Sequence, residues 1–427
     1  MEEKTQYGQY VYDFAKKVID TTGPRLPGSP EEAQGAAMIA DELADIAGKP
    51  SVTEKFVMAP RASIAAIPIL GLLGIISFAL YYVTPFASLV STLLTLVIAI
   101  LQVFTYSGKL DFLFKKEPSQ NVYNTFEPLS GKVERTIILS AHNDSSWCWQ
   151  LSVKNPKTAI LKTVIGVVSV LALMVMSAIA AGMGMYSFMY IGELATAESF
   201  TSAQVFTIVL YFLPLLCLPG CYWLCMYLTW DKSKASPGAM DNMTGVGLCA
   251  AVLKYFYANP DKAPENCRIV AAGMGAEEAS LKGAMAFVQA HKGDPSLMGE
   301  RTYVLNLDSF RDRDYFSVVM GDAWLGSRFD PELRDVCLKV MNDMDLKPGV
   351  ILNPAGGCDS TPFIRAGIRT VTLCAQNPTT TDYYHTYNDT VENLDKSVLD
   401  DSFEMIVNVV NATAEFDAEK NEKSASV

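Results

Sequence analysis

The stretch Arg268–His291, RIVAAGMGAEEASLKGAMAFVQAH, passes from a short apolar run through a glycine-containing turn into a helical pattern. Residues 268–272 have the composition of a buried strand, and residues 281–291 repeat apolar side chains at helical spacing. Between these two elements stand two adjacent carboxylates, Glu277 and Glu278. Strands that alternate with helices are typical of α/β folds, so this stretch predicts an α/β domain with an acidic pair after one of its strands.

The same alternation extends to both sides of this stretch. Helices are predicted at Tyr10–Ile19, Glu31–Ala47, Asn242–Ala258, Pro331–Met344 and Glu392–Phe416, and strands at Ser51–Met58, Asn121–Phe126, Arg135–Ser140, Tyr303–Leu307 and Arg369–Cys374. Residues 419–427 are polar and are predicted to form a disordered tail.

Long uncharged runs interrupt this α/β pattern. They lie between Arg61 and Lys109, between Lys162 and Glu193, and between Glu198 and Asp231. A bilayer crossing takes about 20 apolar residues, so the first run has room for two spanning helices and each of the others for one. Buried core helices are the alternative, but they rarely stay uncharged for so long. The sequence therefore predicts two transmembrane hairpins, at residues 62–108 and 159–230.

Basic residues are distributed unevenly around the predicted spans. The connections at residues 82–86 and 185–204 contain no lysine or arginine, whereas the polar segments that flank the spans carry Arg61, Lys109, Lys115, Lys116, Lys154, Lys157, Lys162, Lys232 and Lys234. Cytoplasmic loops are enriched in such residues, so we expect an integral membrane protein with its catalytic domain in the cytoplasm. The N-terminus has no signal-peptide pattern, and nine cysteines without a CxxC pair fit a reducing compartment.

The overall charge limits the partners of the chain. A net charge of -12 argues against nucleic acid, whose binding needs a basic face.

Cys217, Cys221 and Cys225 recur at helical spacing on the fourth predicted span, where small polarisable side chains are expected to pack at a helix interface. The four predicted spans make the lipid bilayer an expected partner of the chain.

Candidate metal ligands come just after the predicted strands. His142 follows the strand at 135–140, the acidic pair follows the strand at 268–272, and Asp308 follows the strand at 303–307. In open α/β sheets ligands bind beyond the carboxyl ends of the strands, so these side chains are expected to converge. His385 comes one loop after the last predicted strand and has acidic neighbours, whereas His291, at a helix end, is expected to be a surface residue.

Five motifs appear in an order that resembles the two-zinc aminopeptidase family. The motifs are Ser140–Asp144, Pro237–Gly245, Glu277–Glu278, Asn306–Asp308 and Tyr384–Thr386. The family includes aminopeptidase Y, bacterial leucine-type aminopeptidases and glutamate carboxypeptidase. The resemblance covers nearly all of the chain outside the hairpins, and it extends to Thr22–Glu32 and Thr386–Asp395.

The resemblance implies a role for each matching residue. Asp241 would bridge two Zn²⁺ ions, or other divalent metals, with one ion completed by His142 and Asp308 and the other by Glu278 and His385. Glu277 would be the general base that takes a proton from metal-activated water. Asp144 would orient a ligand imidazole, and Tyr384 would donate to the developing oxyanion. One departure is Cys358-Asp359-Ser360, where many relatives have Ser-Asp-His, and it concerns the specificity pocket.

The expected fold is thus a zinc-peptidase α/β domain, a mixed central sheet with helices on both faces, interrupted by the two hairpins. Its segments would be residues 1–61, 109–158 and 231–418. The expected reaction is release of N-terminal residues from a peptide substrate. A carboxypeptidase or a glutaminyl-cyclase-like enzyme on the same scaffold is the alternative. A non-catalytic membrane receptor is a further one, but it conflicts with the complete ligand set, and the scarcity of charges in the spans argues against transport.

The resemblance also implies that the strands at 51–58, 121–126 and 135–140 form an antiparallel meander. Both hairpins would then leave the domain at its catalytic edge, on short tethers. We therefore expect the metal site to open toward the membrane surface and to favour apolar peptides.

Overall fold

The computed structural model describes residues 2–62, 66–155, 157–185, 199, 201–227, 234–354, 356–377 and 382–425. The chain divides into two compact units. Unit 1 contains Met1–Pro60, Phe114–Trp147 and Ala235–Val427, and unit 2 contains Arg61–Leu113 and Cys148–Lys234.

A nine-stranded mixed sheet forms the centre of unit 1, with the order β1-β2-β4-β3-β5-β9-β6-β7 and with β8 paired to β6. Strands β3, β4, β5 and β9 are mutually parallel, whereas β1, β2 and β6 run antiparallel to their neighbours on this path. The strands are β1 (Val52–Met58), β2 (Glu117–Phe126), β3 (Arg135–His142), β4 (Cys267–Met274), β5 (Thr302–Phe310), β6 (Phe316–Asp322), β7 (Ser327–Arg328), β8 (Gly349–Asn353) and β9 (Arg369–Ala375).

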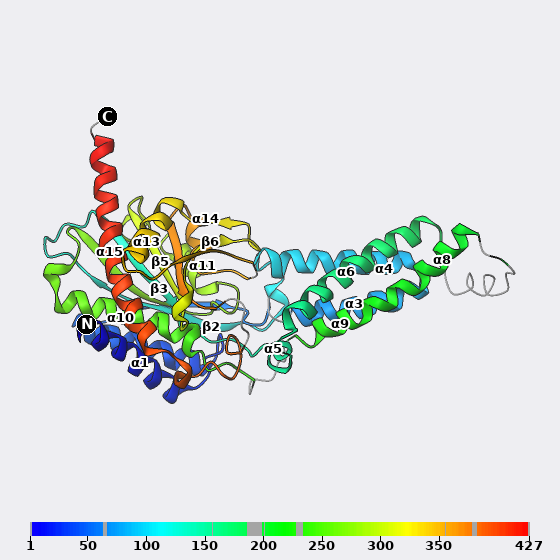
Figure 1. The fold of residues 1–427 in the computed structure, drawn as a ribbon, viewed down its shortest axis with the longest axis horizontal. Helices are drawn as coiled ribbons and strands as arrows, with labels where there is room; N and C mark the ends of the chain where they lie inside the picture. Colours follow the sequence, from blue (N-terminus) through cyan, green and yellow to red (C-terminus); the bar gives the residue numbers. More distant parts are fainter. Residues whose placement is uncertain are drawn as a thin grey trace. The chain divides into compact units, whose positions relative to one another are not determined.

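Helices cover both faces of this sheet, as the sequence predicted (Figure 1). Every residue of β3 is buried, because a parallel strand in the middle of such a sheet has apolar neighbours above and below it. One face packs against α1 (Glu2–Thr22), α2 (Pro30–Ala47), α10 (Thr244–Ala258), α13 (Pro331–Asp343) and α15 (Lys396–Ala425), and the other against α11 (Lys282–Ala290), α12 (Pro295–Met298) and α14 (Ser360–Arg365).

The predicted antiparallel meander is wrong. Strand β4 lies between β2 and β3, so β2 pairs with β4 and not with β3. A strand from much later in the chain takes the central position because its apolar run is buried on both faces. The ends of β1 and β3 nevertheless lie at the same edge of the sheet, since β1 and β3 run in the same direction with β2 and β4 between them. The membrane-facing site stays a prediction.

Two further features differ from the sequence prediction. Helix α15 continues to Ala425, beyond the predicted end at Phe416. The added residues are mostly alanine, glutamate and lysine, which favour helix and contain no glycine or proline to end it. The strands β6, β7 and β8 were not predicted, because β7 and β8 are short and β6, although buried, has no clear alternation of apolar and polar residues.

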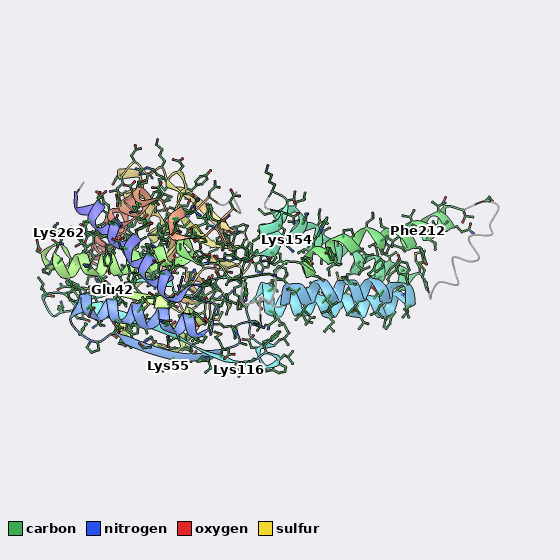
Figure 2. All side chains as sticks on the ribbon, turned by 90° about the horizontal axis from the view of Figure 1, so that it is seen from below. Glu42, Lys55, Lys116, Lys154, Phe212 and Lys262 are labelled. Carbon is green, nitrogen blue, oxygen red and sulfur yellow. The ribbon has the colours of Figure 1, made fainter. Side chains whose placement is uncertain are left out.

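Unit 2 contains four helices that are long and apolar enough to cross a membrane, as predicted. They span 18, 20, 24 and 24 residues, and only 28–33% of each apolar window is buried inside the structure. Figure 2 shows that the side chains around these helices, Phe212 among them, are mostly carbon. The helical segments are α3 (Ala66–Val83), α4 (Pro85–Ile98) with η1 (Ala99–Phe104), α6 (Ala159–Gly182), and α8 (Ser202–Phe212) with η3 (Leu213–Cys217) and α9 (Leu218–Cys225). The predicted connection 185–204 lies largely outside the described residues.

Small residues bring these helices close together. A Cβ atom added to Gly71 would lie 2.5 Å from the backbone nitrogen of Cys225, and one added to Gly74 would lie 2.8 Å from Cys221 Sγ. Cys221 is fully buried at this contact between α3 and α9. The cysteines at helical spacing thus face a helix interface, as the sequence predicted.

Candidate metal centre

The predicted ligands meet at the carboxyl edge of the unit 1 sheet. His142 is the last residue of β3, and Asp308 lies near the end of β5. Glu277 and Glu278 follow β4 by a short turn, and His385 follows β9 by a loop. Asp241 belongs to the segment η4 (Ala239–Met243) just before α10, where its backbone leaves the helical conformation. Because β3, β4, β5 and β9 are parallel, the residues at or beyond their carboxyl ends lie at the same edge of the sheet.

Asp241 lies between two histidines. Its Oδ1 is 3.0 Å from His142 Nε2, and its Oδ2 is 3.0 Å from His385 Nε2. On one side Asp308 Oδ1 is 4.0 Å from His142 Nε2, and on the other Glu278 Oε1 is 3.0 Å from His385 Nε2. All five predicted ligands are thus brought together.

Two groups of donor atoms result, and they share Asp241. One contains His142, Asp241 and Asp308, the other Asp241, Glu278 and His385, and within each group the donor atoms lie within 4.8 Å of one another. Donors around a tetrahedral zinc ion lie roughly 3.3 Å apart, given metal–ligand bonds of about 2.0–2.1 Å. One imidazole and two carboxylates per group are ligands that zinc accepts. The residues present therefore fit zinc.

The electrostatics of the centre favour a bound cation. Burial lowers the pKa of His385, but Glu278 and Asp241 outweigh it and raise the pKa to about 10. Burial likewise opposes the charged form of His142, yet Asp144 and Asp241 raise its pKa well above the ordinary value. Burial alone would raise the pKa of Asp241, but hydrogen bonds from the two histidines hold it below its usual range. Without a metal, protons are drawn to these imidazoles.

Asp144 anchors the acidic pair as well as a histidine. Its Oδ1 and Oδ2 accept hydrogen bonds of 3.0 Å from the backbone N–H groups of Glu277 and Glu278, and Oδ1 lies 3.5 Å from His142 Nδ1. The sequence suggested only the contact with the histidine. Burial, opposed by His142 and reinforced by Glu278, raises the pKa of Glu277 well above its ordinary value. The Glu277 carboxylate is therefore more basic than that of an exposed glutamate.

Tyr384 lies beside the second histidine. Its ring stacks on that of His385, with centroids 4.0 Å apart and an interplanar angle of 23°. Burial, with Asp241 and Glu278 nearby, raises the pKa of the Tyr384 hydroxyl well above its ordinary value, so the phenol keeps its proton. A protonated phenol is a hydrogen-bond donor. Its contact with an oxyanion stays a prediction.

Arg25, a fully buried arginine that was not predicted, forms hydrogen bonds to the loops next to the predicted ligands. Arg25 donates to the backbone oxygens of Gly23, Asn143, Pro237 and Gly238, at 2.9 to 3.1 Å. It thereby links the loop that follows His142 to the loop that precedes Asp241. Arg25 lies in the stretch Thr22–Glu32, which the resemblance covered, but no pattern in that stretch indicates that this side chain is buried.

Two buried carboxylates outside the predicted set also hold ligand loops. Asp389 accepts hydrogen bonds from the backbone N–H groups of Met240 and Asp241, and Glu32 accepts one from Ala276. Burial raises the pKa of Asp389 to about 7 and that of Glu32 to about 8. Both lie in stretches that the resemblance covered, but no chemistry had been assigned to them.

The divergent segment Cys358-Asp359-Ser360 lies in the interior of unit 1. Asp322 accepts hydrogen bonds from the Cys358 backbone N–H at 3.0 Å and from the Thr361 hydroxyl at 2.5 Å. Asp359 is buried, and neither of its carboxylate oxygens has a hydrogen-bond partner among the described residues. Burial raises the pKa of Asp359 to about 8, with His142 opposing. The carboxyl group of Asp359 therefore interacts electrostatically with His142 of the first donor group.

The fold of this chain is similar to those of solved zinc peptidases and of a glutaminyl cyclase. A zinc aminopeptidase from Bacillus subtilis superposes with a TM-score of 0.54 at 14% identity, covering 94% of each chain. A glutaminyl cyclase from an Acidobacteriales bacterium gives 0.53 at 14% identity, covering 96% of this chain and 94% of its own. A Zn-dependent exopeptidase from Parabacteroides distasonis gives 0.52 at 13%, covering 95% and 97%. A comparison with curated proteins gave no match.

The sequence itself matches a peptidase family. Residues 229–410 fit the profile of peptidase family M28, and this stretch contains four of the five predicted ligands as well as Glu277 and Tyr384. Only His142 and Asp144 lie outside it. The predicted resemblance to the two-zinc aminopeptidases is confirmed over these residues, and the similar folds include zinc aminopeptidases.

Proposed function

We propose that the chain is a membrane-embedded two-zinc aminopeptidase that releases N-terminal residues from peptides. The observation that carries this proposal is the shared carboxylate of Asp241, whose two oxygens each approach a different histidine at 3.0 Å. A single metal site would need only one of these contacts. Two complete donor groups support two ions.

The roles of the residues follow from their positions. Zinc ions held by the two groups would polarise the scissile carbonyl and make water acidic enough to ionise near neutral pH. Glu277, next to the donor residue Glu278, would accept the proton of the attacking water and pass it to the leaving amine. Asp144 fixes the backbone from which Glu277 projects. Tyr384, which keeps its proton, donates a hydrogen bond to the oxyanion.

The membrane part of the proposal rests on unit 2. Four helices of 18 to 24 residues expose most of their apolar surface, which a bilayer would cover. The basic residues beside the spans, such as Lys115 and Lys154, favour a cytoplasmic location for the peptidase unit. The partners in this proposal are thus a peptide substrate and the lipid bilayer.

A glutaminyl cyclase is the second candidate, because the similar structures include glutaminyl cyclases from an Acidobacteriales bacterium and from Bacteroides thetaiotaomicron. Such an enzyme closes an N-terminal glutamine on itself and releases ammonia without cleaving a peptide bond. The two complete donor groups favour hydrolysis.

The test is a substrate panel on the detergent-purified, zinc-loaded chain. Peptides with a free N-terminal amine, the same peptides with an acetylated amine, and peptides that begin with glutamine are followed by mass spectrometry. We expect stepwise loss of residues from the free-amine peptides and no cleavage of the acetylated ones. Cleavage of acetylated peptides at their carboxyl end would indicate a carboxypeptidase, and loss of ammonia alone would indicate a cyclase.

A further inference from the structure

Ser146 contacts the imidazole of His385 on the side away from the metal group. Its Oγ lies 3.1 Å from His385 Nδ1, whereas His385 Nε2 faces Asp241 and Glu278 at 3.0 Å each. Both residues are buried, with 3% of Ser146 and 6% of His385 exposed. The serine hydroxyl therefore contacts the ring nitrogen that does not belong to the donor group.

The tautomer of His385 decides whether it binds a metal. A ligand imidazole must present an unprotonated nitrogen, and the other ring nitrogen then carries the proton and needs an acceptor. The donor group uses Nε2, so the proton belongs on Nδ1. The nearest acceptor shown for that nitrogen is Ser146 Oγ.

The backbone holds Ser146 in this position from two directions. Its carbonyl oxygen accepts a 2.8 Å hydrogen bond from Ser236 N–H, and Trp147 forms a bridge with Ala235. The preceding residue, Ser145, exchanges hydrogen bonds with Arg25, its N–H donating to the Arg25 oxygen at 2.9 Å and its Oγ accepting from the Arg25 N–H at 2.8 Å. The serine thus belongs to a braced segment and not to a free loop.

We propose that Ser146 is a positioning residue of the second metal group: its hydroxyl oxygen accepts a hydrogen bond from His385 Nδ1–H, which keeps the proton on Nδ1 and the unprotonated Nε2 directed at the ion. This inference rests on the proposed function. The same short segment then supports both ions, since Asp144 contacts Nδ1 of His142 in the first group as Ser146 contacts Nδ1 of His385 in the second. Alternate residues of one segment provide the ligand and both supports.

The experiment measures zinc affinity in the full-length protein. Ser146→Ala removes the acceptor and Ser146→Thr keeps it. Ser317→Ala is a matched control, because it removes a buried hydroxyl of β6 whose one hydrogen bond among the described residues goes to the backbone oxygen of Tyr315. Each metal-free protein is titrated with zinc in competition with a chromophoric chelator. Loss of such a supporting contact weakens metal binding about 10- to 100-fold, so we expect one of the two ions to bind that much more weakly in Ser146→Ala. Ser146→Thr and Ser317→Ala should stay within about threefold of wild type.

A second readout reports the hydrogen bond itself. The chain has only three histidines, so ¹⁵N-histidine labelling gives few signals. In the zinc-loaded wild type, the Nδ1 proton of His385 should exchange slowly with water. It should exchange at least about tenfold faster in Ser146→Ala, while the signals of His142 stay in place.

The outcomes separate this inference from the function on which it rests. If Ser146→Ala binds both ions as tightly as wild type, or if the His385 proton lies on Nε2, the positioning role is wrong although the zinc peptidase stands. If wild type binds no zinc at all, the proposed function itself fails.

Discussion

Asp241 is the midpoint of the metal centre, since its two carboxylate oxygens lie 3.0 Å from His142 and 3.0 Å from His385. Because the two donor groups share this carboxylate, they are not two independent sites. If the centre holds two ions, as proposed, removing Asp241 affects both of them, whereas removing a residue that belongs to one donor group affects one.

Asp241→Ala should therefore lower the zinc content from two ions per chain toward none. Asp308→Asn should lower it toward one, because Asp308 belongs only to the His142 group. Plasma emission spectroscopy on dialysed protein gives both values. Retention of two ions by Asp241→Ala would contradict the shared ligand.

Glu277→Gln should leave both ions bound and slow hydrolysis of aminoacyl substrates at least about 100-fold, because the amide cannot take the proton of water. Glu278→Gln is the matched variant at the next position, and it should lose metal as well as activity. Zinc content and turnover are measured on the same preparations. Full activity in Glu277→Gln would show that another group is the base.

Zinc uptake should release protons. Without metal the pKa of His385 is raised from 6.5 to about 10 and that of His142 is raised well above 6.5, so both imidazoles are charged at pH 7. Zinc needs them neutral, and we expect about two protons released per chain and an affinity that rises with pH. Calorimetry in buffers of different ionisation enthalpy measures the number.

The same shifts predict how the metal-free protein responds to pH. Since the folded-state pKa of His385 is above its unfolded value, the charged imidazole stabilises the fold fully below pH 6.5 and this contribution is lost as the pH rises through about 10. Thermal unfolding of the metal-free protein between these values should show a falling midpoint. A flat profile would contradict the raised pKa.

Reporter fusions test the topology. A reporter at Val427 should lie in the cytoplasm and one near Ala197 on the opposite side, because the connection that contains Ala197 carries no lysine or arginine. Alkaline phosphatase and green fluorescent protein fusions give complementary signals. An external C-terminus would contradict the proposed orientation.

The close packing of the apolar helices predicts where substitutions are tolerated. In Gly71→Leu the larger side chain would collide with the α9 backbone, so we expect a loss of at least about 1–3 kcal/mol in stability. The adjacent Leu72 is 53% exposed, and Leu72→Ala should have little effect in detergent. Thermal melts of both variants in the same detergent provide the comparison.

Sequence patterns predicted most helices and most of the central strands, because burial on both faces leaves a long apolar run such as the one that ends at His142. They could not predict the order of the sheet. Whether β4 or β3 lies next to β2 depends on contacts between residues more than a hundred positions apart, and both strands have similar composition.

The ligands were predictable because each chemical type stands at the end of a strand or in a quoted motif. Apart from Asp144, the residues that support these side chains were not predictable. Ser146 is one of many serines in the chain, and Arg25 would ordinarily be expected at the surface. Only the fold shows that one lies 3.1 Å from a ligand histidine and the other is completely buried.

The order of the ligands along the chain has a consequence for biosynthesis. His142 precedes the third and fourth apolar helices, and Asp241, Glu278, Asp308 and His385 all follow the last of them, which ends at Cys225. A nascent chain on the ribosome therefore cannot assemble either donor group until all four helices have been translated. If those helices enter the membrane as they emerge, both donor groups become complete only on a chain that is already inserted.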